Sequence, residues 1–255
     1  MRRDALELDR FYRSRRGMTA KAMIERRLAA IWPDVRDLDI LGCGFATPYL
    51  DDMRPVARRA VAFMPAGQGA IIPSMPSRVA MGDETHMPFP DAMFDRLLMI
   101  HMLEEADNLG ALLREAWRVL APEGRMVVVT AARAGVWAWL DSTPFGHGRP
   151  FSRGQLTRLL DDSMFQTTAW SRALYAPPFN WAAHRGVATA WEKTGETVWG
   201  GLGGVILVEA VKRTGALHPR PRTAPVHAPA LEASGPAALS PSKSRNGASD
   251  SRGQT

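Results

Sequence analysis

A short glycine turn contains the first residues whose spacing could do chemistry. Gly42, Cys43 and Gly44 follow the apolar run at residues 38–41, which predicts a strand that enters a tight turn. Glycines let a backbone approach a ligand closely, and the amides that begin a following helix favour a negative group. A turn of this kind is also an ordinary connection between two elements, so by itself it leaves both interpretations open.

Two histidines are candidates for a general base. His101 directly follows the apolar run 94–100, and His147 lies in a loop between two glycines. Imidazole titrates near neutral pH and can accept a proton from a substrate. A histidine that ends a buried strand often serves structure instead, and His147 could simply pair with Asp141 and Arg149 in a turn.

Other polar and aromatic residues have less specific patterns. Glu104 and Glu105 are adjacent and would point apart, which favours two solvated side chains over a carboxylate pair. The six histidines and the single cysteine have no metal-ligand spacing, and no G-x-S-x-G turn predicts a hydrolase nucleophile. Four tryptophans could line an apolar pocket or belong to the core: Trp137, Trp139, Trp181 and Trp191.

Alternating strands and helices must position these groups. Apolar runs predict strands at 38–41, 60–63, 78–81, 94–100, 125–130, 167–175 and 204–211. Amphipathic patterns predict helices at 18–32, 108–120 and 152–164. Apolar strands that alternate with helices indicate a doubly wound α/β fold, whose parallel sheet binds ligands at the carboxyl ends of its strands.

The composition is that of a globular protein. Of the 255 residues, 45% are apolar and 23% are charged, which excludes a fibrous or mainly disordered chain. One cysteine cannot form an internal disulfide, and no apolar run approaches the ~20 residues of a membrane span. The N-terminus lacks the apolar run of a signal peptide, so we expect a cytoplasmic protein.

Charge and composition divide the chain near residue 213. Residues 28–213 contain 18 basic and 20 acidic side chains, so the formal net charge of +6 comes from the two ends and nucleic acid is not an expected partner. Residues 214–255 are rich in Pro, Ala and Ser without any aromatic residue, which predicts a disordered tail. We expect one domain at 1–213, with an N-terminal helical segment at about 1–34.

A dinucleotide interpretation fits poorly. The G-x-G-x-x-G pattern needs a small residue where Thr47 stands, and an acid about 20 residues further on. The chain instead has Arg58 and Arg59 there, which could serve a 2′-phosphate, so an NADP-type site remains an alternative.

Three motifs follow one another in the chain: LDILGCG at 38–44, GDETHMPFPDAMFD at 82–95 and LREAWRVLAPEG at 113–124. In this order they resemble class I S-adenosylmethionine-dependent methyltransferases, in the small-molecule branch called type 11. The loop TPFGHGRP at 143–150 is similar to that of an uncharacterised bacterial subgroup. The resemblance implies a seven-stranded, mostly parallel Rossmann-like sheet that ends in an antiparallel hairpin.

The same resemblance implies S-adenosylmethionine as the cofactor and suggests its contacts. A turn around the methionine end would include Asp39, Gly42, Cys43 and Gly44. Asp83, with Glu84 beside it, would face the adenine amino group, and Ile100 and His101 would border the methionine side and the substrate opening.

The chain departs from the family at two positions. Ala46 replaces a glycine of the turn, and the second strand leads to Gln68 where the family has an acid for the ribose hydroxyls. An amide offers one acceptor and two donors. Loss of a charge-assisted bond lowers affinity by ~1.5–3 kcal/mol.

Two main hypotheses follow. The first is a methyltransferase that acts on an unidentified small molecule by in-line transfer, with His147 or His101 as base and substrate entry over 133–153 and 176–200. The second is an inactive methyltransferase-fold protein that senses a ligand or binds a partner. Gln68 facing the ribose favours the enzyme, whereas a pocket filled by Met64 or Phe45 favours the binding protein. An RNA methyltransferase is a third alternative, which the net charge of the core disfavours.

Overall fold

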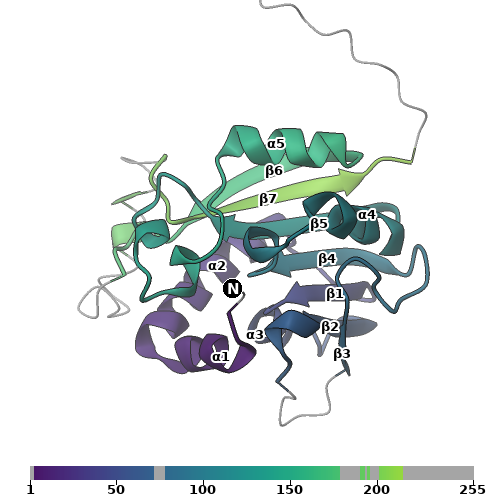
Figure 1. Ribbon diagram of the computed structural model, residues 1–255, viewed down its shortest axis with the longest axis horizontal. Coiled ribbons are helices and arrows are strands. Elements are labelled where there is room, and N and C mark those ends of the chain that lie inside the picture. The colour runs from purple at the N-terminus through teal and green to yellow at the C-terminus, as the bar shows by residue number, and fades with distance from the viewer. Residues whose placement is uncertain (1–2, 72–77, 179–189, 193, 196–200, 215–255) are drawn as a thin grey trace, which may run out of the picture. The chain divides into compact units, whose positions relative to one another are not determined.

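The sheet has the predicted topology. The computed structural model describes residues 3–71, 78–178, 190–192, 194–195 and 201–214. Within these residues, seven strands form one sheet in the order β3-β2-β1-β4-β5-β7-β6 (Figure 1). The first five strands pair in parallel, and β7 pairs antiparallel with both β5 and β6. The doubly wound, mostly parallel sheet with its C-terminal hairpin is therefore confirmed.

The strands and helices begin and end close to the predicted positions. The strands are β1 Asp39–Gly44, β2 Arg59–Pro65, β3 Arg78–Gly82, β4 Phe94–Ile100, β5 Leu120–Ala131, β6 Phe165–Ala173 and β7 Val205–Lys212. The α-helices are α1 Ala5–Arg13, α2 Arg15–Ile31, α3 Thr47–Leu50, α4 Leu109–Val119 and α5 Arg153–Asp162. The predicted tail, apart from residue 214, lies outside the described residues, and its boundary stays a prediction.

Alternate residues of the strands build two apolar layers. Ile40 and Leu98 face a core that also contains Leu8, Ile24 and Leu50 of the first three helices. The residues between them, such as Leu41 and Leu97, face a second core that contains residues of α4 and α5. Two buried faces explain why the central strands are apolar throughout rather than alternating.

The N-terminal helical segment is a pair of helices with its own caps. Asp4 caps α1 by accepting a hydrogen bond from the amide of Leu6 at 2.7 Å. Ser14 ends α1 and caps α2, since its hydroxyl accepts from the amide of Gly17 at 3.1 Å. A Cβ atom at Gly17 would stand 1.9 Å from the carbonyl oxygen of Phe11, so only glycine allows this close junction.

These two helices cover a face that crossover helices cover in most doubly wound sheets. The connection from β1 to β2 contains only the four-residue helix α3, and the one from β3 to β4 contains no helix. Their place is taken by α1 and α2, which precede β1 in the chain (Figure 1). Among the described residues, none of the helices combines the length and apolar character that a bilayer span requires.

Candidate functional site

A cleft of about 860 Å³ opens where β2, β3 and β4 end. Pro65 and Gly82, the last residues of β2 and β3, line it together with the segment that follows β4. Six charged residues line this cleft: Asp83, Glu84, Glu104, Glu105, Asp107 and Arg149. Five carboxylates against one guanidinium create a negative potential, which favours a cationic ligand and disfavours a phosphate.

Glu104 is the most enclosed carboxylate of the cleft. Its residue is 2% exposed, and among the described residues neither carboxylate oxygen has a hydrogen-bond partner. The nearest positive candidate is Nδ1 of His101, 3.6 Å from Oε1. The prediction of a solvated Glu104 is therefore wrong.

The burial of Glu104 comes from a loop more than forty residues away. The amide of Arg149 donates to the carbonyl oxygen of Glu104 at 2.9 Å. Gly148 has a φ of +75°, and a Cβ atom there would stand 2.6 Å from the same oxygen. Glycine at 148 thus lets the loop close over Glu104.

His101 connects Glu104 to two buried tyrosines. The hydroxyl of Tyr49 donates to that of Tyr12 at 3.0 Å, and the Tyr12 hydroxyl lies 2.8 Å from Nε2 of His101. Nε2 of His101 thus faces Tyr12, and its Nδ1 faces Glu104. Burial raises the pKa of Tyr12 and of Tyr49 well above the ordinary value, so both hydroxyls stay protonated.

Gln68 stands beside this chain. Its Nε2 donates to the carbonyl oxygen of His101 at 3.2 Å, while its Oε1 is buried and has no hydrogen-bond partner among the described residues. The amide nitrogen of Gln68 is thus bonded, whereas its oxygen, just after β2, is an acceptor without a partner among the described residues. This is the position where the resemblance expects an acceptor for ribose hydroxyls.

The glycine turn itself lies under α1. Gly44 has a φ of +76°, and a Cβ atom there would stand 2.3 Å from the carbonyl oxygen of Ile100. That oxygen accepts a hydrogen bond from the amide of Phe45 at 3.0 Å. The ring of Tyr12 stacks on the ring of Phe45 with centroids 5.7 Å apart, so a residue of α1 covers the turn.

Cys43 is not a nucleophile in this arrangement. It is fully buried in the second apolar layer. Burial raises the pKa of its thiol far above the ordinary value. Cys43 therefore serves as a small apolar side chain of β1 in this layer.

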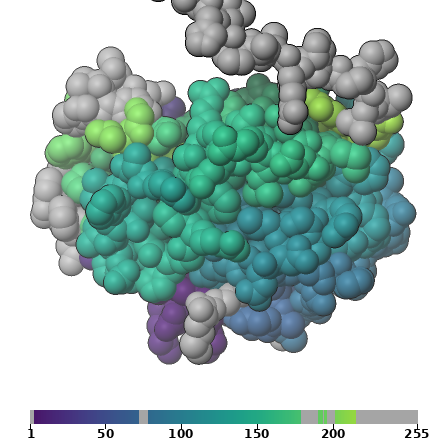
Figure 2. Space-filling model, turned by 45° about the horizontal axis from the view of Figure 1, so that its top comes forward, coloured from purple at the N-terminus to yellow at the C-terminus, as the bar shows by residue number. Residues whose placement is uncertain are grey.

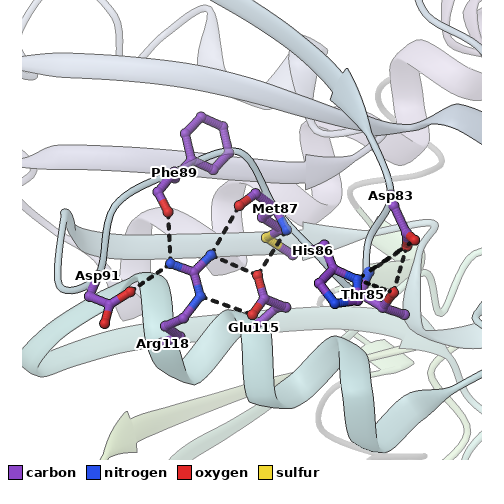
Figure 3. Close-up of polar contacts among 8 residues, drawn as sticks. All are labelled: Asp83, Thr85, His86, Met87, Phe89, Asp91, Glu115 and Arg118. Atoms are coloured by element: carbon purple, nitrogen blue, oxygen red, sulfur yellow. Dashed lines mark hydrogen bonds and ion pairs between the residues drawn. The ribbon is translucent and has the colours of Figure 1, made fainter.

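The loop that follows β3 is held by Arg118 of α4 (Figure 3). Nη1 donates to the carbonyl oxygen of Phe89 and to Asp91, both at 2.7 Å, and Nη2 donates to the carbonyl oxygen of Met87 at 3.0 Å. Nε and Nη2 also grip the carboxylate of Glu115, which accepts from the amide of Met87 as well. These bonds lower the pKa of Glu115, with Arg118 as the largest cause.

Asp83 is exposed at the start of the same loop. Its Oδ1 accepts from the amide and the hydroxyl of Thr85, both at 2.8 Å, which lowers the pKa of the carboxyl (Figure 3). Glu84 is buried, at 7% exposure. Both line the cleft, so the structure brings these two expected residues together with Glu104.

His147 is half-buried in the loop that borders the cleft. Nη2 of Arg3 lies 2.9 Å from its Nε2 and donates to the carbonyl oxygen of Asp141. Arg149, the alternative partner, donates instead to the carbonyl oxygen of Ala106. Arg3 also donates to Glu105, and Figure 2 shows purple N-terminal residues at the lower rim of the molecule beside teal residues from the middle of the chain.

Asp39 lies away from these residues. It begins β1, whereas the cleft lies where the strands end, and Arg58 donates to its carboxylate at 2.7 Å. Arg58 and Arg59 both pair with Asp39, so neither is placed to bind a 2′-phosphate in the cleft. The expected contact between Asp39 and the cofactor stays a prediction, and both arginines of the NADP alternative are engaged by Asp39.

The tryptophans are divided among different environments. Trp137 is 3% exposed and donates to the carbonyl oxygen of Ala176, whereas Trp139 is 79% exposed. Trp181 and most of the expected entry segment 176–200 lie outside the described residues. In the described part of the chain, no group of three or more His, Cys, Asp or Glu residues could hold a metal ion.

Comparison with known proteins supports a methyltransferase fold. A family model described as a methyltransferase domain matches residues 41–128, which include β2, β3 and β4 and most of β1 and β5. The demethylmenaquinone methyltransferase of Tropheryma whipplei strain Twist is 45% identical over 51 residues. That match spans 20% of this chain and 20% of the relative.

Two solved structures share the fold over most of the chain. A Thermotoga maritima S-adenosylmethionine-dependent methyltransferase, titled a possible histamine N-methyltransferase, has a TM-score of 0.55 and 16% identity, covering 82% of this chain and 95% of that one. A geranyl diphosphate methyltransferase in complex with GPP and sinefungin has a TM-score of 0.52 and 16% identity, covering 74% and 78%. This chain therefore shares the fold of these methyltransferases, and its residues 41–128 match the model of a methyltransferase domain.

Proposed function

We propose that this chain is an S-adenosylmethionine-dependent methyltransferase that acts on a small molecule. The observation that carries the proposal is the acidic cleft at the ends of β2, β3 and β4, within and beside the matched methyltransferase domain. S-Adenosylmethionine is a cation with several hydrogen-bond donors. Five lining carboxylates and one guanidinium suit such a ligand.

Two buried acceptors support the fit to this cofactor. Oε1 of Gln68 and the carboxylate of Glu104 lie close to His101 and have no hydrogen-bond partner among the described residues. Buried acceptors in native proteins are normally paired. Hydroxyl or ammonium groups of a bound cofactor would satisfy both. Asp83 and Glu84 would then hold the adenine end, as the resemblance suggests.

The protein's own residues need only align the substrate with the methyl group and accept one proton from the substrate. When bound, S-adenosylmethionine supplies a methyl group that its sulfonium already activates. Nε2 of His101 contacts the hydroxyl of Tyr12, and its Nδ1 lies 3.6 Å from Glu104, so we assign His101 a positioning role. His147 is our candidate base, in the loop that meets the cleft through Gly148 and Arg149, and it can accept a proton once Nη2 of Arg3, 2.9 Å from its Nε2, moves away.

A second candidate function rests on the cover over the glycine turn. Phe45 is 2% exposed and stacked under Tyr12, and Met64 is fully buried. Side chains that fill the methionine end in this way favour a methyltransferase-fold protein that senses a ligand or binds a partner. For the enzyme, α1 must shift when the cofactor enters, because Tyr12 covers Phe45 next to Gly44.

Calorimetric titration of the full chain with S-adenosylmethionine and S-adenosylhomocysteine tests the proposal. We expect micromolar binding that Asp83→Ala and Glu104→Gln each weaken by about tenfold or more, since charge-assisted bonds contribute ~1.5–3 kcal/mol. Asp161→Asn, on α5 outside the cleft, is the matched control and should bind like the wild type.

The opposite result is equally clear. A folded chain that binds neither compound up to millimolar concentration would overturn the enzyme proposal. In that case the ligand-sensing or partner-binding function becomes the better account of the covered turn.

A further inference from the structure

A second pocket, far along the sheet from the cleft, has the opposite charge. It has a volume of about 300 Å³ and lies at β6, the edge strand of the sheet. We define the arginine pocket by its lining residues Arg27, Arg153, Trp170, Ser171, Arg172, Tyr175 and Ile206. Three guanidinium groups and no carboxylate line it, which makes it attractive to an anion.

Arg153 is held in place by an aromatic ring. Its guanidinium carbon lies 4.8 Å from the ring centre of Trp170. Stacking uses the flat face of a guanidinium and leaves its N–H donors available at the rim. No hydrogen bond or ion pair joins Arg153 to an acidic side chain in the described part of the molecule. The stacking on Trp170 thus fixes the guanidinium of Arg153, and its N–H groups have no acidic partner among the described residues.

Arg172 has a buried donor without a partner. It follows Trp170 by two residues on β6, so both side chains project from the same face of the strand. Nη1 of Arg172 is buried and has no hydrogen-bond partner among the described residues. A buried charged donor in a native protein normally has an acceptor, and here the acceptor is missing from the described residues.

One acidic residue lies near this pocket. The Oε1 atom of Glu192, a residue that is 1% exposed, accepts a hydrogen bond from the amide of Tyr175 at 2.6 Å, whereas its Oε2 is buried without a hydrogen-bond partner among the described residues. Burial raises the pKa of its carboxyl, while its backbone hydrogen bonds and then Arg27 and Arg26 act in the opposite direction. Glu192 therefore offsets part of the charge of Arg27, but in the described part of the molecule no ion pair joins it to Arg153 or Arg172, on which the site depends.

We propose that the arginine pocket binds a small phosphorylated anion through Arg153 and Arg172. A phosphate group has several acceptor oxygens, and guanidinium forks match their geometry. The small volume favours a single phosphate or phosphate ester over a long strand of RNA. This site is separate from the acidic cleft, and the inference does not depend on the proposed methyltransferase activity.

Titration calorimetry on the full chain tests the proposal with inorganic phosphate, pyrophosphate and ribose 5-phosphate. At about 150 mM salt, where diffuse surface attraction is screened, we expect at least one of these to bind. Binding of the ester alone identifies an organophosphate, and binding of the inorganic ions identifies free phosphate. Both results support the site.

Variants locate the binding. Arg172→Gln and Arg153→Gln should each weaken affinity by about tenfold or more, because each removes a guanidinium donor. Arg158→Gln is the matched control, on the same helix as Arg153 but outside the pocket. Arg172→Lys is a milder change that keeps the positive charge, so it tests the role of the guanidinium if Arg172→Gln disturbs the edge strand. Arg153 is exposed, so its variant carries the test if Arg172→Gln does not fold.

Three results would overturn the proposal. One is the absence of binding by all three phosphate compounds to folded protein. Another is an equal loss in Arg158→Gln, which would indicate general surface charge. The third is binding of a short single-stranded RNA without any binding of the small phosphates, which would assign the pocket to nucleic acid.

Discussion

The loop after β3 and the segment after β4 leave the same edge of the sheet but satisfy their polar groups differently. In the loop, Arg118 binds two backbone carbonyls and two carboxylates, and Glu115 accepts from a backbone amide as well. After β4, both carboxylate oxygens of Glu104 are buried and without hydrogen-bond partners among the described residues, and so is Oε1 of Gln68, which follows β2 and bonds to the carbonyl oxygen of His101 through its amide nitrogen.

This difference separates a region built for stability from one kept for a ligand. A fully paired network rigidifies the chain and holds its loop in one conformation. Unpaired buried acceptors lower stability, and native proteins tolerate them mainly at functional sites. Substitutions in the loop should therefore reduce stability, and those after β4 should reduce binding.

The largest expected effect is that of Arg118→Met. The change leaves the mostly buried carboxylate of Glu115 without its cation and frees two carbonyl oxygens, which should cost ~2–4 kcal/mol of unfolding free energy. Urea unfolding followed by circular dichroism measures it. Arg114→Met, an exposed change on the same helix, is the control. Equal losses in the two variants would mean that the network contributes nothing.

A smaller effect should depend on pH. The pKa of Glu115 lies below its ordinary value of 4.5, so its charged form stabilises the fold above that pH, and the contribution is lost as the pH falls through the lowered folded pKa. Glu115→Gln should therefore be roughly 1–2 kcal/mol less stable than the wild type at pH 7. The gap should close in acid. A constant gap in unfolding curves between pH 7 and pH 3 would contradict the assignment.

The smallest effect on stability is expected at Glu104. Replacement of an unpaired buried carboxylate by a neutral amide of similar size removes a desolvated charge, so Glu104→Gln should stay within ~1 kcal/mol of the wild type or exceed it. The same unfolding experiment decides this. A loss as large as that of Arg118→Met would show that Glu104 is a structural residue, and the contrast between the two regions would fail.

The parts of the fold that the sequence predicts are those with local causes. The apolar run of β4 was predicted residue for residue at Phe94–Ile100, and the helix predicted at 152–164 is α5, Arg153–Asp162, with Ser152 as its cap. Both depend on side chains within a few positions of each other. Asp83 and Glu84 also lie in the cleft, because a motif next to a strand end fixes their place.

The parts that the sequence does not predict depend on distant contacts. Glu104 is buried by Gly148 and Arg149, and no local pattern shows that this loop closes over it. Likewise, the partner of His101 is Tyr12, which is 89 residues away. Asp39 precedes the glycine turn by only a few residues in the sequence, but it begins β1, so the length of the strand separates it from the cleft, which lies where the strands end.

The contacts of α1 also determine when the protein can finish folding during synthesis. Tyr12 can contact His101 only after His101 has been made, and Arg3 can contact His147 only after a further 144 residues have been added to the chain. At ~5–20 residues per second, the ribosome needs roughly 7–30 s to make that stretch. The helix α1 is therefore made well before the residues against which it docks, and until then Leu8 and Tyr12 lack partners that bury them. Elongation speed over this stretch sets how long that apolar surface stays open to other chains.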